Sequence, residues 1–260
     1  MQLRTDEIAD GIYRISAYIP DIAPPAGFTF NQFLVAADDP LLYHAGHREM
    51  YPLIAEQVAR LVPLERLRWV AFGHVEADEC GAMNRWLDAS ARAEVAHLEI
   101  GCDLSLRDMA DRPPRAVEDG EVIDLGGKRV RFIATPHVPH NWETQVIFEE
   151  TTGTLFCGDL LAHIGNVAAL TESDVVEPAM HTEEIFHGSS LSAHGGATIR
   201  RLAELEPATL ALMHGASYTG DAAGVLRDLA ADHDRRVLAA LEAGQPAAGN
   251  GCPPLVGHTH

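Results

Sequence analysis

A compact group of metal-ligand residue types lies in the segment 73–81, which reads Gly-His-Val-Glu-Ala-Asp-Glu-Cys-Gly. It directly follows the apolar run 69–72, which reads as a buried strand. Its ligand-type side chains are one imidazole and three carboxylates, from His74, Glu76, Asp78 and Glu79. Crowded carboxylates repel one another and resist burial, so a bound cation explains the group most simply. The alternative is a solvated acidic turn with a chance histidine, because short motifs also match by accident.

Three later segments also place a ligand-type residue beside a predicted strand. They contribute His137 and His140 in Pro-His-Val-Pro-His, Asp159 in Gly-Asp, and His214 in Met-His-Gly. Metal sites on layered α/β scaffolds collect ligands from the ends of several strands, where loops converge on a rigid sheet. The four segments together therefore predict a metal centre at one edge of a sheet.

Length and composition bound the fold. The chain has 260 residues, of which 47% are apolar and 22% charged, and this suits one large globular domain or two small ones. No linker divides it, so we expect one domain over 1–243. The Pro- and Gly-rich segment 244–260 should be a disordered tail.

Charge and hydropathy exclude several classes of partner. There are 19 basic and 38 acidic residues, a formal charge of −19, which argues against nucleic acid or an anionic membrane. No stretch approaches the ~18 uninterrupted apolar residues of a membrane span, and the N-terminus lacks the plan of a signal peptide. A cytoplasmic protein is the expectation.

The four cysteines form no Cys-x-x-Cys pair, so we expect reduced thiols rather than a zinc knuckle or an iron–sulfur cluster.

The periodicity of apolar residues predicts a mixed α/β (α+β) fold. Strands are expected at 12–15, 33–36, 41–44, 67–72, 94–97, 122–125, 129–133, 145–149, 154–157 and 210–213. Helices are expected at 51–61, 82–91, 197–205 and 221–241, the last capped by Asp221. Two meander-plus-helix halves suggest two sheets packed face to face with helices outside, a four-layered αββα sandwich.

Residues 160–196 lack strong periodicity but carry four histidines. These are His163, His181, His187 and His194. Long insertions in compact domains are usually functional, so we expect a loop or short helices that cover the site.

The order His74-x-Glu76-x-Asp78, His140, Asp159 and His214 resembles the metallo-β-lactamase superfamily over most of residues 8–235. Within it, the resemblance is to the diiron branch of flavodiiron and oxygen-binding diiron proteins. Hydrolases of the superfamily have His-x-His-x-Asp-His, whereas flavodiiron proteins have glutamate at the position of Glu76.

The resemblance implies a pair of iron ions, with zinc or manganese as alternatives. One iron would take His74, Glu76 and His140, with His137 as the alternative to His140. The other would take Asp78 and His214, Asp159 would bridge both, and Glu79 stands where the family usually has histidine. Glu79 would either coordinate, which lowers the reduction potential, or swing away and leave an open position.

The function implied is binding or reduction of dioxygen, or of nitric oxide, with no catalytic residue beyond the metal ligands. Whether the protein is an enzyme stays open. Flavodiiron proteins carry a flavodoxin domain after the metal domain, and no Gly-rich phosphate loop follows the last expected helix here, so we expect no flavin site. Such a protein would be an O2 sensor or an oxidoreductase with an external redox or signalling partner, and it could form a homodimer.

A hydrolase is the competing hypothesis. A dinuclear zinc or iron site could activate water against a thioester, lactone or phosphoester. Glu76 argues against this function. A degenerate, non-catalytic site is a third possibility.

Overall fold

Two seven-stranded sheets form the centre of the computed structural model, which describes residues 1–244. The first contains, in spatial order, β1 (Gln2–Ala9), β2 (Ile12–Ile19), β3 (Phe28–Val35), β4 (Leu41–Tyr43), β5 (Trp69–Ala71), β6 (Glu94–Leu98) and β7 (Arg115–Val117). Strands β1 to β4 are antiparallel, and β4 to β7 run parallel. The first half is therefore the antiparallel meander that the sequence predicts.

The second sheet has the spatial order β12, β14, β13, β11, β10, β9, β8. Its strands are β8 (Val122–Asp124), β9 (Arg129–Ala134), β10 (Gln145–Glu149), β11 (Thr154–Phe156), β12 (Leu170–Thr171), β13 (Thr209–Ala211) and β14 (Ser217–Thr219). Strands β11 and β13 are parallel neighbours, so the loops after them leave the sheet at the same edge.

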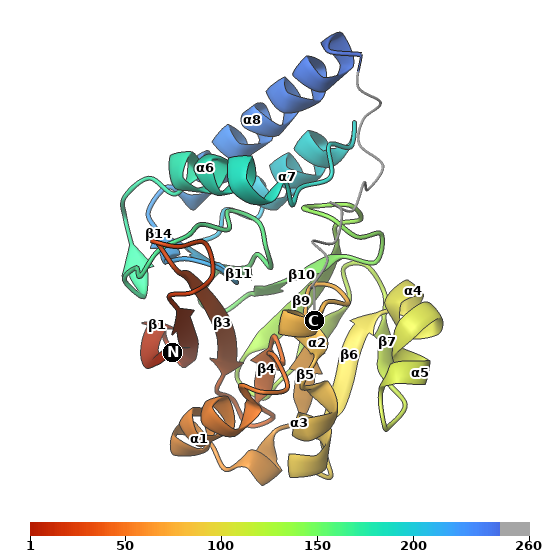
Figure 1. Ribbon diagram of the computed structural model, residues 1–260. Coiled ribbons are helices and arrows are strands. Elements are labelled where there is room, and N and C mark those ends of the chain that lie inside the picture. Colours follow the sequence, from red (N-terminus) through yellow and green to blue (C-terminus); the bar gives the residue numbers. More distant parts are fainter. Residues whose placement is uncertain (245–260) are drawn as a thin grey trace, which may run out of the picture.

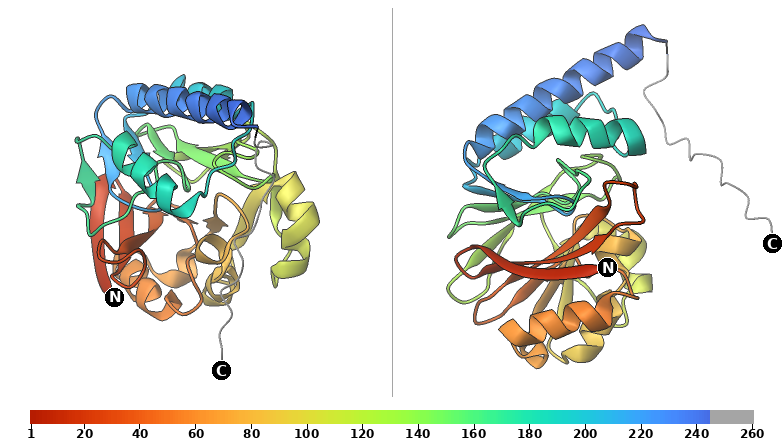
Figure 2. Two further views of the ribbon diagram at one scale, coloured as in Figure 1. Left: turned by 45° about the horizontal axis from the view of Figure 1, so that its top comes forward. Right: turned by 60° about the vertical axis from the view of Figure 1, so that its left-hand side comes forward.

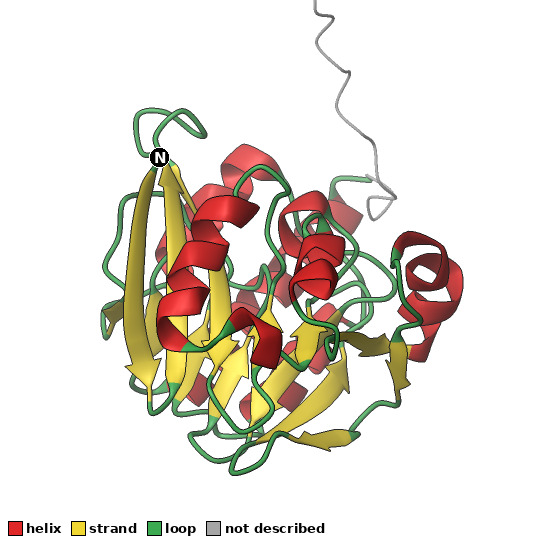
Figure 3. Cartoon of the chain, turned by 90° about the horizontal axis from the view of Figure 1, so that it is seen from below, coloured by secondary structure: helices red, strands yellow, loops and turns green. Residues whose placement is uncertain are grey.

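Helices cover the outer face of each sheet. On the first sheet lie α1 (Tyr51–Leu61), α2 (Ala77–Cys80), α3 (Met83–Ala89), α4 (Glu99–Gly101) and α5 (Arg107–Met109), with short turns at Leu64–Arg66 and Cys102–Leu106. On the second lie α6 (Val176–Phe186), α7 (Gly195–Ala203) and α8 (Ala222–Glu242). Figure 1 and the right-hand view of Figure 2 show the resulting four layers. Figure 3 shows the helices that lie across the first sheet, seen from below.

Three groups of buried side chains fill the spaces between these layers. Phe33, Tyr43, Phe132 and Phe156 belong to the group between the two sheets. A second group joins the first sheet to α1 and α3, and a third joins the second sheet to α6, α7 and α8. Three apolar interfaces are what a four-layered sandwich requires, so the predicted αββα architecture is confirmed.

Most predicted elements are present at or near their expected bounds. Helix α1 has the predicted range, and the Asp221 side chain caps α8 by accepting a hydrogen bond from the amide of Gly224 at 2.8 Å. The sequence prediction omitted strands β1, β7, β12 and β14 and the eleven-residue helix α6. The predicted tail 244–260 lies outside the described residues apart from Gly244.

No helix within residues 1–244 is both long and apolar enough to cross a membrane. Three of the four cysteines, Cys80, Cys102 and Cys157, are buried free thiols, as expected, and Cys252 lies outside the described residues.

Candidate metal centre

The predicted ligand residues lie in four loops at one edge of the sandwich. His74 and Glu76 follow β5, and Asp78 lies in the short helix α2. His140 lies between β9 and β10, Asp159 follows β11, and His214 follows β13. The sheet fixes the start of each loop, so side chains far apart in the sequence converge at this edge.

Four of these residues form one compact group of donor atoms. Single atoms of His74, Glu76, His140 and Asp159 all lie within 4.8 Å of one another. Nε2 of His74 is 2.7 Å from Oε2 of Glu76, and Nε2 of His140 is 2.9 Å from Nε2 of His74. Two ring nitrogens and two carboxylates that face a common point suit a divalent cation with mixed nitrogen and oxygen ligands.

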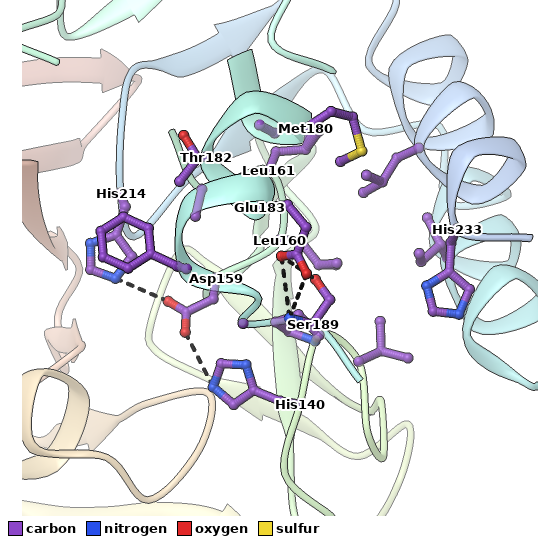
Figure 4. Close-up of a pocket in the computed structure, with 18 of the residues that line it drawn as sticks. His140, Asp159, Leu160, Leu161, Met180, Thr182, Glu183, Ser189, His214 and His233 are labelled. Carbon is purple, nitrogen blue, oxygen red and sulfur yellow. Dashed lines mark hydrogen bonds and ion pairs between the residues drawn. The ribbon is translucent and has the colours of Figure 1, made fainter. Parts of the chain in front are cut away.

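A second group shares Asp159 with the first. Nε2 of His214 lies 3.2 Å from Oδ1 of Asp159 and 3.4 Å from Oδ2 of Asp78. The other oxygen of Asp159, Oδ2, lies 3.5 Å from Nε2 of His140. Figure 4 shows Asp159 between the two imidazoles. One carboxylate therefore faces both groups, which is the arrangement that a bridging ligand of two metal ions needs.

The backbone fixes the orientation of the His214 ring. Its Nδ1 donates a hydrogen bond to the carbonyl of Thr29 at 2.7 Å, and the ring stacks on Phe28 with centroids 4.3 Å apart. A neutral imidazole that donates from Nδ1 presents a lone pair at Nε2. Nε2 faces Asp78 and Asp159. A ring that carries its proton on Nδ1 is the tautomer that a metal ligand bound through Nε2 requires.

Buried polar side chains hold the loop that carries His214. The Asn31 amide donates to the carbonyls of Leu212 at 2.8 Å and Gly215 at 3.0 Å, and the Arg14 guanidinium donates to Gly215 at 2.8 Å. The sequence prediction did not include Asn31 or Arg14. The polar pair Asn31-Gln32 within a largely apolar strand was a signal for Asn31.

The electrostatics of the site favour a bound cation. Burial lowers the pKa of His74, but the charge of Glu79 and the hydrogen bond to Glu76 outweigh it and raise that pKa to about 10. Burial likewise lowers the pKa of His214, but its contacts with the carboxylates of Asp159 and Asp78 outweigh burial and raise that pKa to about 10. Hydrogen bonds from His140 and His74 lower the pKa of Glu76 to about 2. Carboxylates that hold extra protons on neighbouring imidazoles would hold metal ions in their place.

Glu79 lies behind His74 rather than among the converging donor atoms. Its Oε2 accepts hydrogen bonds from the amides of Gly73 at 2.5 Å and His74 at 2.9 Å, and its Oε1 lies 3.3 Å from Nδ1 of His74. Nε2 of His44 lies 3.5 Å from the same Oε1. Burial raises the pKa of Glu79 to about 7. The carboxylate is thus bound to the backbone on the far side of the imidazole, an arrangement that fits the second of the two alternatives for Glu79, in which it leaves an open position.

The structure places the two candidates for the third histidine ligand, His140 and His137, differently relative to the group of donor atoms. His140 points its Nε2 at His74 and Asp159, whereas His137 is exposed and its atoms are absent from the compact donor group. His137 still lines the cavity beside the site.

Of the four histidines in 160–196, His163 is the buried one. Its Nδ1 donates to the carbonyl of Leu161 and its Nε2 accepts from the amide of Ala216, both at 2.9 Å. One ring nitrogen therefore contacts the loop of Asp159 and the other the loop of His214. The other three, His181, His187 and His194, are exposed.

The donor set fits two metal ions. Oδ1 of Asp159 is buried and accepts no hydrogen bond from any described residue, although Nε2 of His214 is near. Five further donor side chains face the same space, each placed by a strand end or a fixed loop. Together they can hold two divalent cations close enough to act on one small ligand.

Comparison with known proteins points to one family. A family model described as ODP family beta lactamase matches residues 28–215. The chain is 26% identical over 172 residues to the coenzyme F420H(2) oxidase of Methanothermobacter thermautotrophicus, covering 61% of this chain and 42% of the oxidase. It is 29% identical over 226 residues to a hydroxyacylglutathione hydrolase of Acidiphilium cryptum, covering 84% and 79% of the two chains.

The fold is similar to that of solved structures as well. A mutant flavo di-iron protein from Thermotoga maritima superimposes with a TM-score of 0.75 at 22% identity, covering 89% of this chain and 61% of that one. The chain thus spans less than two thirds of the length of this protein and of the oxidase.

Proposed function

The chain belongs to the ODP family of beta lactamase proteins, and on this premise we propose that it holds a pair of iron ions that bind or reduce dioxygen. The observation that carries the proposal is the position of Asp159, whose two oxygens face two separate groups of ligand atoms. Two ferrous ions within ~4 Å of each other would supply two electrons to one diatomic ligand bound between them. Nitric oxide could take the same place as dioxygen.

Each protein residue has a definite task in this proposal. His74, Glu76 and His140 would hold one ion, and Asp78 and His214 would hold the other. Asp159, whose two oxygens face both groups, would be shared between them. The carbonyl of Thr29 keeps the Nε2 lone pair of His214 directed at the site by accepting the Nδ1 proton.

Glu79 acts through His74 in this proposal. Its carboxylate faces Nδ1 of His74 and is fixed by two backbone amides. A carboxylate behind a ligating imidazole orients the ring and raises its basicity. The position where the family usually has a histidine ligand would then be left open.

The charge balance fits two divalent ions. Glu76, Asp78 and Asp159 contribute three negative charges and Glu79, behind His74, contributes a fourth when ionised, against the four positive charges of two divalent ions. Iron suits the mixed imidazole and carboxylate donors, although zinc and manganese would also bind such a set.

An external electron donor is needed if the protein turns over. Reduction of dioxygen consumes electrons that histidine, aspartate and glutamate side chains do not supply. The relative from Methanothermobacter thermautotrophicus is named as an oxidase of a reduced coenzyme, which supports a reductase. Binding without turnover, as in a sensor, would need no donor.

One observation favours a hydrolase. The relative from Acidiphilium cryptum is named as a hydroxyacylglutathione hydrolase and aligns over most of both chains. Against it stands Glu76, whose carboxylate contacts both His74 and His140 at the first group of donors.

The deciding experiment compares both activities on one preparation. Protein loaded with iron without oxygen is mixed with a chemical reductant, and the consumption of dioxygen is measured with an electrode. The same protein, loaded with iron or zinc, is assayed on a thioester. Dioxygen consumption above that of Asp159→Ala supports the proposal, whereas thioester hydrolysis alone would transfer the assignment to a hydrolase.

A further inference from the structure

A cavity of about 260 Å³ includes the space at the metal-centre side chains and extends from there between α6, α7 and α8. In Figure 4, His140, Asp159 and His214 lie at one side of it, and Met180 and His233 lie at the other. Its middle part is lined by apolar side chains from the Asp159 loop and from α6, α7 and α8: Leu160, Leu161, Ala179, Met180, Ile199 and Leu229.

This cavity is much larger than a diatomic ligand requires. An engineered apolar cavity of about 150 Å³ binds benzene, which has six carbon atoms. By the same ratio, 260 Å³ admits a molecule of about ten non-hydrogen atoms. A diatomic ligand between Asp78 and Asp159 would leave the part beneath α6 unused.

The polar side chains at the far end are already paired with one another. Arg236 contacts Oε1 of Glu183 at 3.0 Å and Oδ2 of Asp232 at 3.1 Å. Ser189 donates to Glu183 at 3.0 Å, and Nε2 of His233 donates to the carbonyl of Ser192 at 2.9 Å. Because two carboxylates neutralise Arg236, this end does not attract an anion.

The metal end has the opposite character. With two divalent cations in place, the carboxylates of Glu76, Asp78, Asp159 and Glu79 balance their charge, and the cations themselves would coordinate a carboxylate oxygen of a ligand at this end. A ligand that fits the whole cavity therefore has a negative head at one end and an aliphatic body at the other.

We propose that the cavity binds an aliphatic monocarboxylate of about eight carbons, the carboxyl carbon included, with its carboxylate at the metal end and its chain beneath α6. Eight carbons and two oxygens make ten non-hydrogen atoms, which matches the volume. The inference deepens the proposed function, because the head group depends on the bound metals.

Calorimetry on protein loaded with zinc, which excludes redox chemistry, tests the proposal. Octanoate and acetate share the head group and differ only in the chain. We expect octanoate to bind at least tenfold more tightly than acetate, and removal of the zinc to weaken octanoate binding by at least tenfold. Equal affinities for octanoate and acetate, or an octanoate affinity that is the same with and without zinc, would overturn the proposal.

Substitutions on α6 locate the chain. Met180 lines the cavity, whereas Ile185 lies on the same helix with 47% of its surface exposed and is not among the lining residues. Met180→Trp should weaken octanoate binding at least tenfold and leave acetate binding unchanged, and Ile185→Trp should change neither. Met180→Ala removes bulk from the wall and should shift the preference toward decanoate. Equal effects of the two tryptophan variants, or no change in chain preference for Met180→Ala, would place the chain elsewhere.

The zinc content separates this proposal from the proposed function. Protein that keeps two zinc ions but binds octanoate no better than acetate contradicts the cavity proposal alone. Protein that keeps no zinc contradicts the metal centre and the cavity proposal together.

Discussion

Nδ1 of His74 lies 3.3 Å from Oε1 of Glu79, while Nε2 of the same ring lies 2.7 Å from Glu76 on the opposite side. The ring thus separates a carboxylate that can orient it from the group of donor atoms that can bind a metal. This relationship assigns Glu79 to the support of the centre and leaves six side chains as its ligands.

Replacing Glu79 by glutamine tests that assignment. Glu79→Gln keeps the shape of the side chain but removes its charge, so the protein should still bind two metal ions with an affinity lower by about tenfold. Competition with a chromophoric chelator measures this affinity. Loss of one metal ion per chain would instead show that Glu79 coordinates.

Replacing Asp159 by alanine should abolish stoichiometric binding of two metals. The variant removes the carboxylate whose oxygens face both donor groups. Elemental analysis after dialysis measures the stoichiometry, and Asp228→Ala, an exposed aspartate on α8, is the control. A variant without Asp159 that retains both ions would refute the bridge.

The two histidines of the segment 136–140 should behave differently. His140→Ala removes a nitrogen that faces His74 and Asp159 and should lower the metal content of the first site to a small fraction. His137→Ala should leave the metal content unchanged, because this side chain is exposed and outside the compact donor group. If the metal content instead followed His137, the loop would have to adopt another conformation in the loaded protein.

Stability of the metal-free protein should fall at high pH. In this state the pKa values of His74 and His214 are raised to about 10, against an ordinary value near 6.5. Their contribution to stability is therefore complete below about pH 6.5 and is lost as the pH rises through about 10. Urea unfolding over this range should show the fall, and loading with zinc should largely remove it because metal replaces the protons. A flat profile for the metal-free protein would contradict the charge pattern of the site.

The loop of His214 should depend on Asn31. Asn31→Ala leaves the buried carbonyl of Leu212 without its side-chain donor, and should destabilise the protein by about 1–3 kcal/mol. Urea unfolding measures the change, and the second metal site should show weaker binding in the same variant. A loss below about 0.5 kcal/mol with normal metal binding would mean that Arg14 holds the loop unaided.

The sequence predicted side chains that the structure brings close together, because the loops that carry them follow strand ends, where loops of a layered fold converge. The role of Glu79 could not be predicted in this way. Glu79 and its neighbour Asp78 lie on the short helix α2, where consecutive side chains point about 100° apart. Asp78 therefore faces His214, while Glu79 turns back toward the amide of His74.

The elements that were missed have weak local patterns. Strand β1 forms the edge of the first sheet and carries Arg4, Asp6 and Glu7, so it lacks the apolar alternation of a half-buried strand. Helix α6 contains Pro178 in its first turn and buries few of its side chains. Its packing against α8 and the cavity, rather than its own periodicity, determines its position.

The central claim is a pair of metal ions that responds to dioxygen, and it is tested most directly by loading the protein with iron in the absence of oxygen. Iron is quantified, and the absorption spectrum is followed as dioxygen is added without reductant. We expect two irons per chain and a new oxygen-dependent band, which should be absent from Asp159→Ala. Fewer than two irons, or two irons with an unchanged spectrum, would contradict the claim.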